Sequence, residues 1–292
     1  MRPLAAVFFA ITASLAPDLD GQLVAGGDAL AWEDLVKRAT AARVVYVGEE
    51  HGTASHHRLQ RDLLAALDAA GPVVLACEYF PRSLQPALDR IASGEVAPAD
   101  LRQALRWDET WGHAWEAYAP LFELCLERRI RIVALNAEKD LVQRVRRQGL
   151  GALGFEELLG LPRMDLKAEA HRARVTRQLQ QVHPLPAEAL ERYYQAFTLW
   201  DEAMAEGVVD AVLRDGRPGV RVLVVAGIAH VQTGTGIPDR VARRWSAPRL
   251  IVACGAKVDA ADGDVLYVTA PRRPEGHPPA PAPPAPDRPR WY

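Results

Sequence analysis

The sequence predicts an α/β fold in which a mostly parallel sheet is flanked by helices and carries a smaller helical subdomain as an insertion. Six short apolar runs have the length and composition of buried strands, at 44–47, 73–77, 130–135, 220–226, 249–253 and 265–269. Amphipathic helical patterns such as 59–70 and 191–213 separate them, as is typical of parallel strands joined by helices. The gaps at 80–129 and 137–213 are longer than one crossover helix needs, so we assign the helical insertions to them.

Composition limits the class of partner. The 292 residues are nearly half hydrophobic, which is enough for one large domain. Because 35 basic residues stand against 37 acidic ones, there is no electrostatic reason to expect nucleic acid as a partner. Cys77, Cys125 and Cys254 lie far apart in apolar surroundings, which indicates buried thiols rather than a zinc site or a disulfide framework.

The two ends of the chain fall outside the expected domain, 27–270. Residues 1–16 combine one basic residue, an apolar run and small residues near the end, which predicts a signal peptide and therefore export, to the periplasm or beyond. No cysteine follows the apolar run, so a lipid anchor is not supported. Residues 271–292 are rich in proline, and we expect them to form a disordered tail.

Polar side chains follow the predicted strands at the points where the strands end. GEEH lies at 48–51 after the first strand, EY at 78–79 after the second, Asn136 after the third, and GIAH at 227–230 after the fourth. Parallel strands deliver their carboxyl ends to one edge of the sheet, where such folds bind ligands. We therefore expect His51, Glu78 and His230 to lie together. The simpler alternative is that the histidines cap helices or satisfy buried hydrogen bonds.

Two chemistries suit such an edge. His51, Glu78 and His230 could hold a divalent metal ion with an open position for water. Alternatively, one histidine and one glutamate could activate water without metal, which adds Glu49 to the catalytic candidates of a hydrolase, either an esterase or a peptidase. The sequence has no Gly-x-Ser-x-Gly segment, so we expect no serine nucleophile of that type.

The stretch RWDETWGHAWEAY, residues 106–118, contains aromatic side chains at helical spacing. Steps of four, four and three residues place them on one face of a predicted helix: Trp107, Trp111, Trp115 and Tyr118. Such a face could hold a large planar ligand, or it could pack into the core of the helical subdomain. The same two alternatives, a ligand surface or core packing, apply to the later helix that carries Tyr193, Tyr194, Asp201 and Glu202.

Several of these segments, in their order, resemble the ChaN family of haem-binding uptake proteins, within a wider group that includes the Tiki and TraB proteins and the erythromycin esterases. The segments are GEEHGTASHHRLQRDLL, CEYF, LRWDETWGHAWEAYAPL, ALN, WDEAMAE and VVAGIAHVQTGTGIP, from about Val44 to Pro238. The resemblance implies a parallel sheet with a smaller helical part, export, and binding of iron porphyrin linked to iron acquisition. It also implies a tyrosine ligand to the haem iron, a homodimer that encloses the cofactor, and envelope uptake components as partners.

The resemblance favours an exported haem-binding protein over an enzyme. Ferric iron accepts a phenolate oxygen, and a porphyrin needs an apolar slot and cations for its propionates. The candidates are Tyr79 with Arg82, and Tyr118 on the segment that carries Trp107, Trp111 and Trp115. The paired Gly-x-x-His motifs of the Tiki and TraB relatives serve metal-dependent activity, which carries over to Gly48, His51, Gly227 and His230. The hydrolase therefore stays the alternative, and many ChaN-like proteins carry a lipobox cysteine that this chain lacks.

Overall fold

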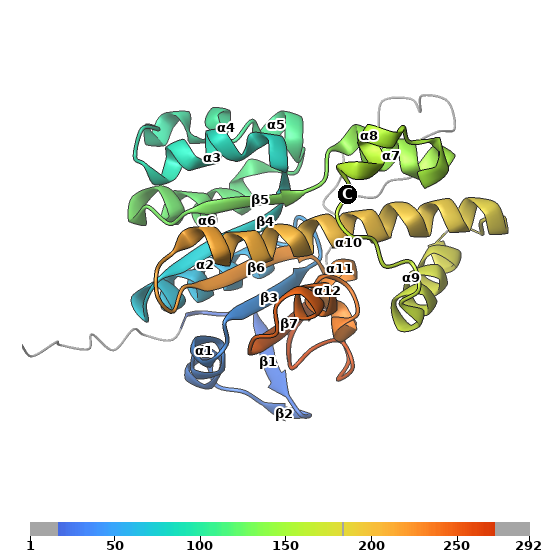
Figure 1. Ribbon diagram of the computed structural model, residues 1–292. Coiled ribbons are helices and arrows are strands. Elements are labelled where there is room, and N and C mark those ends of the chain that lie inside the picture. The colour runs from blue at the N-terminus through green and yellow to red at the C-terminus, as the bar shows by residue number, and fades with distance from the viewer. Residues whose placement is uncertain (1–16, 183, 272–292) are drawn as a thin grey trace, which may run out of the picture.

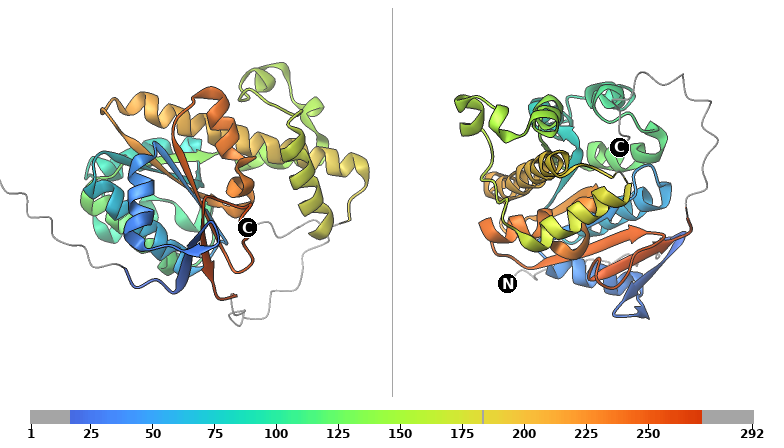
Figure 2. Two further views of the ribbon diagram at one scale, coloured as in Figure 1. Left: turned by 90° about the horizontal axis from the view of Figure 1, so that it is seen from below. Right: turned by 90° about the vertical axis from the view of Figure 1, so that its right-hand side faces the viewer.

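The computed structural model describes residues 17–182 and 184–271, so the predicted signal peptide and nearly all of the proline-rich tail lie outside the described residues. An eight-stranded sheet in the order β2-β1-β8-β7-β3-β6-β4-β5 runs through the centre, with helices on both faces (Figures 1 and 2). The predicted fold class is confirmed.

All six predicted strands are present. They are β3 (Val44–Glu49), β4 (Val73–Pro81), β5 (Ile132–Asn136), β6 (Arg221–Gly227), β7 (Arg249–Gly255) and β8 (Val265–Thr269). Neighbouring strands among these six pair in parallel. Because helices cover both faces, these strands are buried throughout most of their length and are therefore apolar at consecutive positions.

Two further strands were not predicted. β1 (Gly21–Ala25) pairs antiparallel with β8, and β2 (Asp28–Ala29) pairs antiparallel with β1. The predicted domain start at residue 27 is therefore too late in the sequence. A strand of this length leaves little apolar pattern to recognise, because only Leu23 of β1 is buried.

The helices divide between the two faces of the sheet. Strand residues such as Val45 and Val47 pack in one core with α1 (Trp32–Ala41), α2 (Ala54–Ala69), α3 (Gln85–Ala92) and α6 (Trp115–Arg128). Their neighbours Val44 and Tyr46 pack in a second core with α10 (Ala187–Asp215) and α12 (Ile237–Arg244). This alternation follows from the two-residue period of a strand. The predicted buried thiols are confirmed, since all three cysteines are buried and free.

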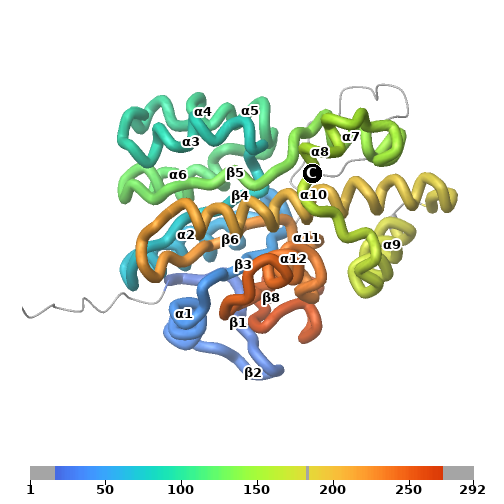
Figure 3. The backbone as a smooth tube through the Cα atoms, viewed as in Figure 1, coloured from blue at the N-terminus to red at the C-terminus, as the bar shows by residue number. Residues whose placement is uncertain are grey.

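The two long gaps are helical, as predicted. The first contains α3, α4 (Leu101–Ala104), α5 (Trp107–Thr110) and α6, and the second contains α7 (Lys139–Gln148), α8 (Phe155–Leu159), α9 (Glu169–Val182) and most of α10. Figure 3 shows these as two groups, on the left and on the right of the view. No helix in the described ranges is both long enough and apolar enough to cross a membrane.

The aromatic stretch at 106–118 does not form the single helix that its spacing predicts. The chain leaves α5 at Trp111 and enters α6 at Trp115, and Gly112 between them has a positive φ of 75°, which glycine adopts without strain. The rings still meet, because Trp107 lies 4.8 Å from Tyr118 and 5.4 Å from Trp115 between ring centroids. The core-packing alternative therefore describes Trp107, which is fully buried.

Replacement of Trp107 by alanine should destabilise the fold strongly. The indole is buried and its Nε1 donates to the carbonyl of His113 at 2.8 Å, so the variant loses packing and leaves a cavity, at a cost of about 3–5 kcal/mol. Phe155→Ala is the control, because Phe155 is 73% exposed and should change stability by less than about 0.5 kcal/mol. Urea unfolding of both variants measures the difference, and equal losses would contradict this assignment.

Candidate functional site

The structure brings together the side chains that were expected to converge at the carboxyl edge of the sheet. β6 lies between β3 and β4, so the ends of these three strands are adjacent. The Gly227 amide donates to Oε2 of Glu78 at 2.6 Å, and Nε2 of His230 lies 3.6 Å from Oε1 of Glu78. A β-carbon placed on Gly227 would lie 2.9 Å from Cε1 and Nε2 of His51 and 3.5 Å from Oε2 of Glu78. His51, Glu78 and His230 therefore surround one point.

The glycine of each Gly-x-x-His motif makes room for the other motif. Only glycine fits at Gly227, because the ring of His51 occupies the space of a side chain. A β-carbon on Gly48 would in turn lie 3.1 Å from Cα of Ile228 and 3.2 Å from Cβ of Val231, both in the short helix α11 (Ile228–Val231). The two motifs are therefore fitted to each other across β3 and β6.

Glu49, at the end of β3, is a buried carboxylate with an unusually full set of partners. They come from the following turn, from α2 and from β4: Nδ1 of His51 at 2.8 Å, Nδ1 of His57 at 3.2 Å, Nε2 of Gln60 at 2.6 Å and the hydroxyl of Tyr79 at 2.6 Å. Burial alone would raise the pKa of Glu49, but His57 and His51 hold this pKa well below its usual range. Glu49 therefore stays ionised and orients the ring of His51.

Asp201, in the middle of α10, does the same for His230. One carboxylate oxygen lies 2.6 Å from Nδ1 of His230, and the other lies 2.8 Å from Nε2 of His171 on α9. Arg240 on α12 reaches Nδ1 of His171 at 2.9 Å. Because arginine can only donate, Nδ1 of His171 accepts, and its Nε2 must donate to Asp201. This buried chain fixes the tautomer of His171 and the orientation of both imidazoles.

The charges at the edge favour protonated imidazoles. Burial alone would lower the pKa of His230, but the carboxylates of Glu78 and Asp201 raise it above its usual value. Burial likewise opposes the charge of His51, and the hydrogen bond to Glu49 together with the charge of Glu78 raises the pKa of His51. The pKa of Asp201 is lowered, since His230 and His171 outweigh the effect of burial.

Two histidines thus have Nδ1 held by a carboxylate, while the opposite side of each ring is directed toward Glu78. Imidazoles oriented in this way serve as general acids and bases, and the same second-shell carboxylates are usual behind metal-bound histidines. Among the residues that the structure describes, however, no three His, Cys, Asp or Glu side chains are arranged to hold a metal ion. The orientation of His51 and His230 beside Glu78 suits acid–base use.

The predicted haem ligands lie in the interior. Tyr79 and Tyr118 are no more than 1% exposed, and both hydroxyls contact Glu49, at 2.6 Å and 3.5 Å. Burial and the charge of Glu49 raise the pKa of both phenols, which is the opposite of what an iron-bound phenolate requires. Arg82 does not accompany Tyr79, because its guanidinium pairs with Glu206 at 2.8 Å. In this arrangement neither phenol is accessible to a haem iron.

Trp111 and Trp115 occupy different places in the same aromatic cluster. Trp111 is 6% exposed and lies 4.8 Å from the ring of His51, which places it over the carboxyl edge. Trp115 is partly buried and stacks on Phe122 of α6 at 6.0 Å. Trp107, Trp111 and Trp115 therefore belong to one cluster that packs into the protein, which favours the core-packing alternative over an open wall for a planar ligand.

A different aromatic row lies on α10. Tyr193, Phe197 and Trp200 follow one another at steps of four and three residues, and all three are partly exposed. Phe197 stacks on His230 with ring centroids 4.5 Å apart and planes 15° apart, so the row ends at the carboxyl edge. The guanidinium of Arg146, on α7, lies 5.4 Å from the ring centre of Tyr193. The other five tyrosines in the described ranges are buried.

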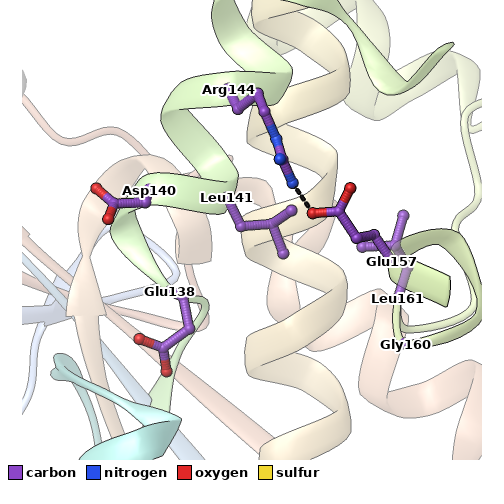
Figure 4. A pocket seen from close by; sticks show the side chains of 7 residues that line it. All are labelled: Glu138, Asp140, Leu141, Arg144, Glu157, Gly160 and Leu161. Carbon is purple, nitrogen blue, oxygen red and sulfur yellow. Dashed lines mark hydrogen bonds and ion pairs between the residues drawn. The ribbon is translucent and has the colours of Figure 1, made fainter. Parts of the chain in front are cut away.

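A hollow of about 470 Å³ between α7 and α8 is the wrong kind of site for a porphyrin (Figure 4). Three carboxylates and one arginine line it, namely Glu138, Asp140, Glu157 and Arg144, with Leu141, Gly160 and Leu161. Arg144 already pairs with Glu157. The hollow therefore offers no cation for a propionate and no histidine or tyrosine for iron.

Sequence reasoning missed the residues that orient the site. His171 and Arg240 stand in segments without any motif, and only the folded chain brings them to Asp201. Asp201 and Glu202 did carry a signal, since two adjacent acids interrupt the apolar face of a helix in the segment WDEAMAE. Such a pair is fully buried only when cations or imidazoles satisfy it, as they do here.

The fold and the edge together define an α/β protein with a parallel sheet, helical insertions and two carboxylate-oriented histidines at the strand ends. The profile of the family described as haem-binding uptake, Tiki superfamily, ChaN matches residues 35–241. The chain belongs to this family, which confirms the resemblance seen in its motifs.

A solved structure shares this fold. ChaN of Campylobacter jejuni, described with cofacial haem binding, matches with a TM-score of 0.70 and 19% identity over 86% of this chain and 97% of that one. Looser likenesses include a mutant of the erythromycin esterase EreC in its open conformation, with a TM-score of 0.47 and 14% identity over 82% of this chain and 79% of that one. No curated protein sequence is similar enough to count as a match.

Replacement of Glu49 by alanine should destabilise the protein more than an ordinary surface change. The variant leaves the hydroxyl of Tyr79, the amide of Gln60 and the ring of His57 buried without their shared acceptor, at a cost of about 3–5 kcal/mol. Glu50→Ala is the control, because Glu50 is its neighbour in sequence but is only partly buried. Urea unfolding followed by circular dichroism checks this expectation, and similar midpoints for both variants would contradict it.

Proposed function

We propose that this protein binds haem. The observation that carries the proposal is the match of residues 35–241 to the haem-binding uptake family. The shared fold with ChaN of Campylobacter jejuni is consistent with it. Haem bound to such a site supplies a ferric iron that takes an oxygen or nitrogen ligand from the protein, and a large apolar ring that must be removed from water.

The residues of α10 fit this group better than the buried tyrosines do. Tyr193 is partly exposed and offers a phenol oxygen as a ligand, and the guanidinium of Arg146 over its ring is a cation within reach of a propionate on the same surface. Phe197 and Trp200 continue the row and supply flat apolar surface for a porphyrin. We therefore assign the haem ligand to Tyr193 instead of Tyr79 or Tyr118.

We propose that the protein is exported, acts in haem and iron uptake with other envelope components, and forms a homodimer when it binds haem. Support for a self-contact comes from α8, where Phe155, Leu158 and Leu159 are exposed by 73%, 44% and 66%. Sedimentation with and without haemin measures the oligomeric state.

Tyr193→Phe should change the visible spectrum of the haemin complex and weaken binding by about tenfold or more, because the ring stays while the ligating oxygen is lost. Haemin titration followed by absorption spectroscopy is the measurement. Tyr79→Phe and Tyr118→Phe are matched controls and should leave the spectrum unchanged, although each loses a buried hydrogen bond. Failure of the parent protein to bind haemin saturably would sink the haem proposal, and an unchanged Tyr193→Phe spectrum would remove Tyr193 as the ligand.

A hydrolase at the carboxyl edge is a second candidate function. The observation that favours it is the pair of carboxylate–histidine units, Glu49 with His51 and Asp201 with His230, on either side of Glu78. Oriented imidazoles beside a buried carboxylate can remove a proton from water and return it to a leaving group. The sequence has no Gly-x-Ser-x-Gly segment, so we take water as the attacking group.

His230→Ala and Glu78→Gln should each lower kcat/KM for p-nitrophenyl acetate by about 100-fold or more if this site is hydrolytic. The rate should rise with pH above 6.5, because the base is the neutral imidazole and the pKa of His230 is raised. Glu206→Gln is the control, a carboxylate that pairs with Arg82 away from Glu78. A parent protein without activity above the buffer rate, or variants as active as the control, would reject the hydrolase.

A further inference from the structure

Arg174, on α9, is a cation whose hydrogen-bonding capacity is largely unused. Its Nε donates to the hydroxyl of Thr235 at 2.9 Å, which fixes the direction of the guanidinium. Both terminal nitrogens, Nη1 and Nη2, are buried, and within residues 17–182 and 184–271 neither has a hydrogen-bond partner. Buried guanidinium groups are normally paired, since an unmet charged donor costs more than a neutral one.

The surroundings show that this guanidinium belongs to the carboxyl edge. Its charge acts on Asp201 and on both imidazoles that Asp201 holds, because it opposes protonation of His171 and of His230. Asp201 does not hydrogen-bond Arg174, because neither terminal nitrogen of Arg174 has a partner within the described ranges, whereas the two oxygens of Asp201 contact those imidazoles at 2.6 and 2.8 Å. The guanidinium is therefore close enough to the edge to influence it, but its two terminal nitrogens donate to no group in the part of the chain that the structure describes.

The turn that fixes Arg174 is itself tightly constrained. Thr233 has a positive φ of 58°, which is unfavourable for a β-branched residue. Gly236 has no space for a side chain, because a β-carbon there would lie 2.1 Å from the carbonyl oxygen of His230. The turn at 232–236 therefore packs directly on His230 and presents the hydroxyl of Thr235 to Arg174.

We propose that Arg174 forms an anion-binding subsite beside His230, and that it takes a carboxylate group of the ligand through its two terminal nitrogens. A guanidinium offers two parallel N–H groups that match the two oxygens of a carboxylate. A lysine in the same place would offer only a point charge. Two sources share this chemistry, a haem propionate and the carboxylate of a separate small molecule. Only the first of them rests on the proposed haem function.

Acetate is the probe for the subsite itself. Titration of ¹⁵N-labelled protein with sodium acetate, against sodium chloride at equal ionic strength, should give saturable shifts at the side chain of Arg174 and the amide of Thr235. Arg174→Gln should weaken acetate binding at least tenfold. Arg177→Gln is the matched control, an exposed arginine on the same helix, and should bind acetate like the parent. Arg174→Met, which replaces an unpartnered cation with an apolar chain, serves if the Gln variant does not fold.

Haemin and haemin dimethyl ester then identify the source of the carboxylate. If it is a propionate, Arg174→Gln should weaken haemin at least tenfold and leave the affinity for the ester unchanged. If acetate binding is lost in the variant while haemin affinity is unaffected, the subsite stands and serves another carboxylate. A parent that binds acetate but not haemin sinks the haem proposal alone. No saturable acetate shift in the parent, or equal acetate affinity in parent and Arg174→Gln, overturns the subsite.

Discussion

The buried carboxylate of Glu49 is the interaction on which the rest of the site depends. It ends the central strand of the parallel sheet, and its two oxygens gather donors from the turn after β3, from α2 and from β4. An isolated carboxylate at this depth would be strongly unfavourable, so its partners must all be present together. Glu49 therefore links the packing of α2 and β4 to the orientation of the His51 ring. Tyr79 is buried because its hydroxyl is one of the donors that stabilise this carboxylate.

The two Gly-x-x-His motifs form one structural unit. β3 and β6 are neighbours although more than 170 residues of sequence lie between them, and each contributes a glycine where the other motif needs space. The histidines then approach Glu78 from two sides, with Glu49 and Asp201 behind them. A parallel sheet makes this arrangement easy to reach, because adjacent strands end at the same edge.

Sequence periodicity was enough for the six buried strands and for the convergence of His51, Glu78 and His230, since both follow from apolar runs and the geometry of parallel strands. Periodicity does not predict which of two similar aromatic patterns is buried, because tertiary packing decides this. Trp107 and Trp111 have the same four-residue spacing as Tyr193 and Phe197, yet the first pair is buried and the second is partly exposed. His171, Arg174 and Arg240 have no pattern at all, because their roles arise from the packing of α9, α10 and α12.

The proposed haem surface and the acid–base edge are physically continuous. Phe197 belongs to the aromatic row and also stacks on His230, while Asp201 one turn further along α10 holds the same imidazole. A planar ligand on this row would therefore cover His230 and limit the access of water to Glu78. Hydrolysis needs that water, whereas haem binding benefits from its removal. The two functions thus make opposite demands on one surface. The buried carboxylates and imidazoles stay in place under the aromatic row, so the edge could act on water only while no planar ligand covers His230.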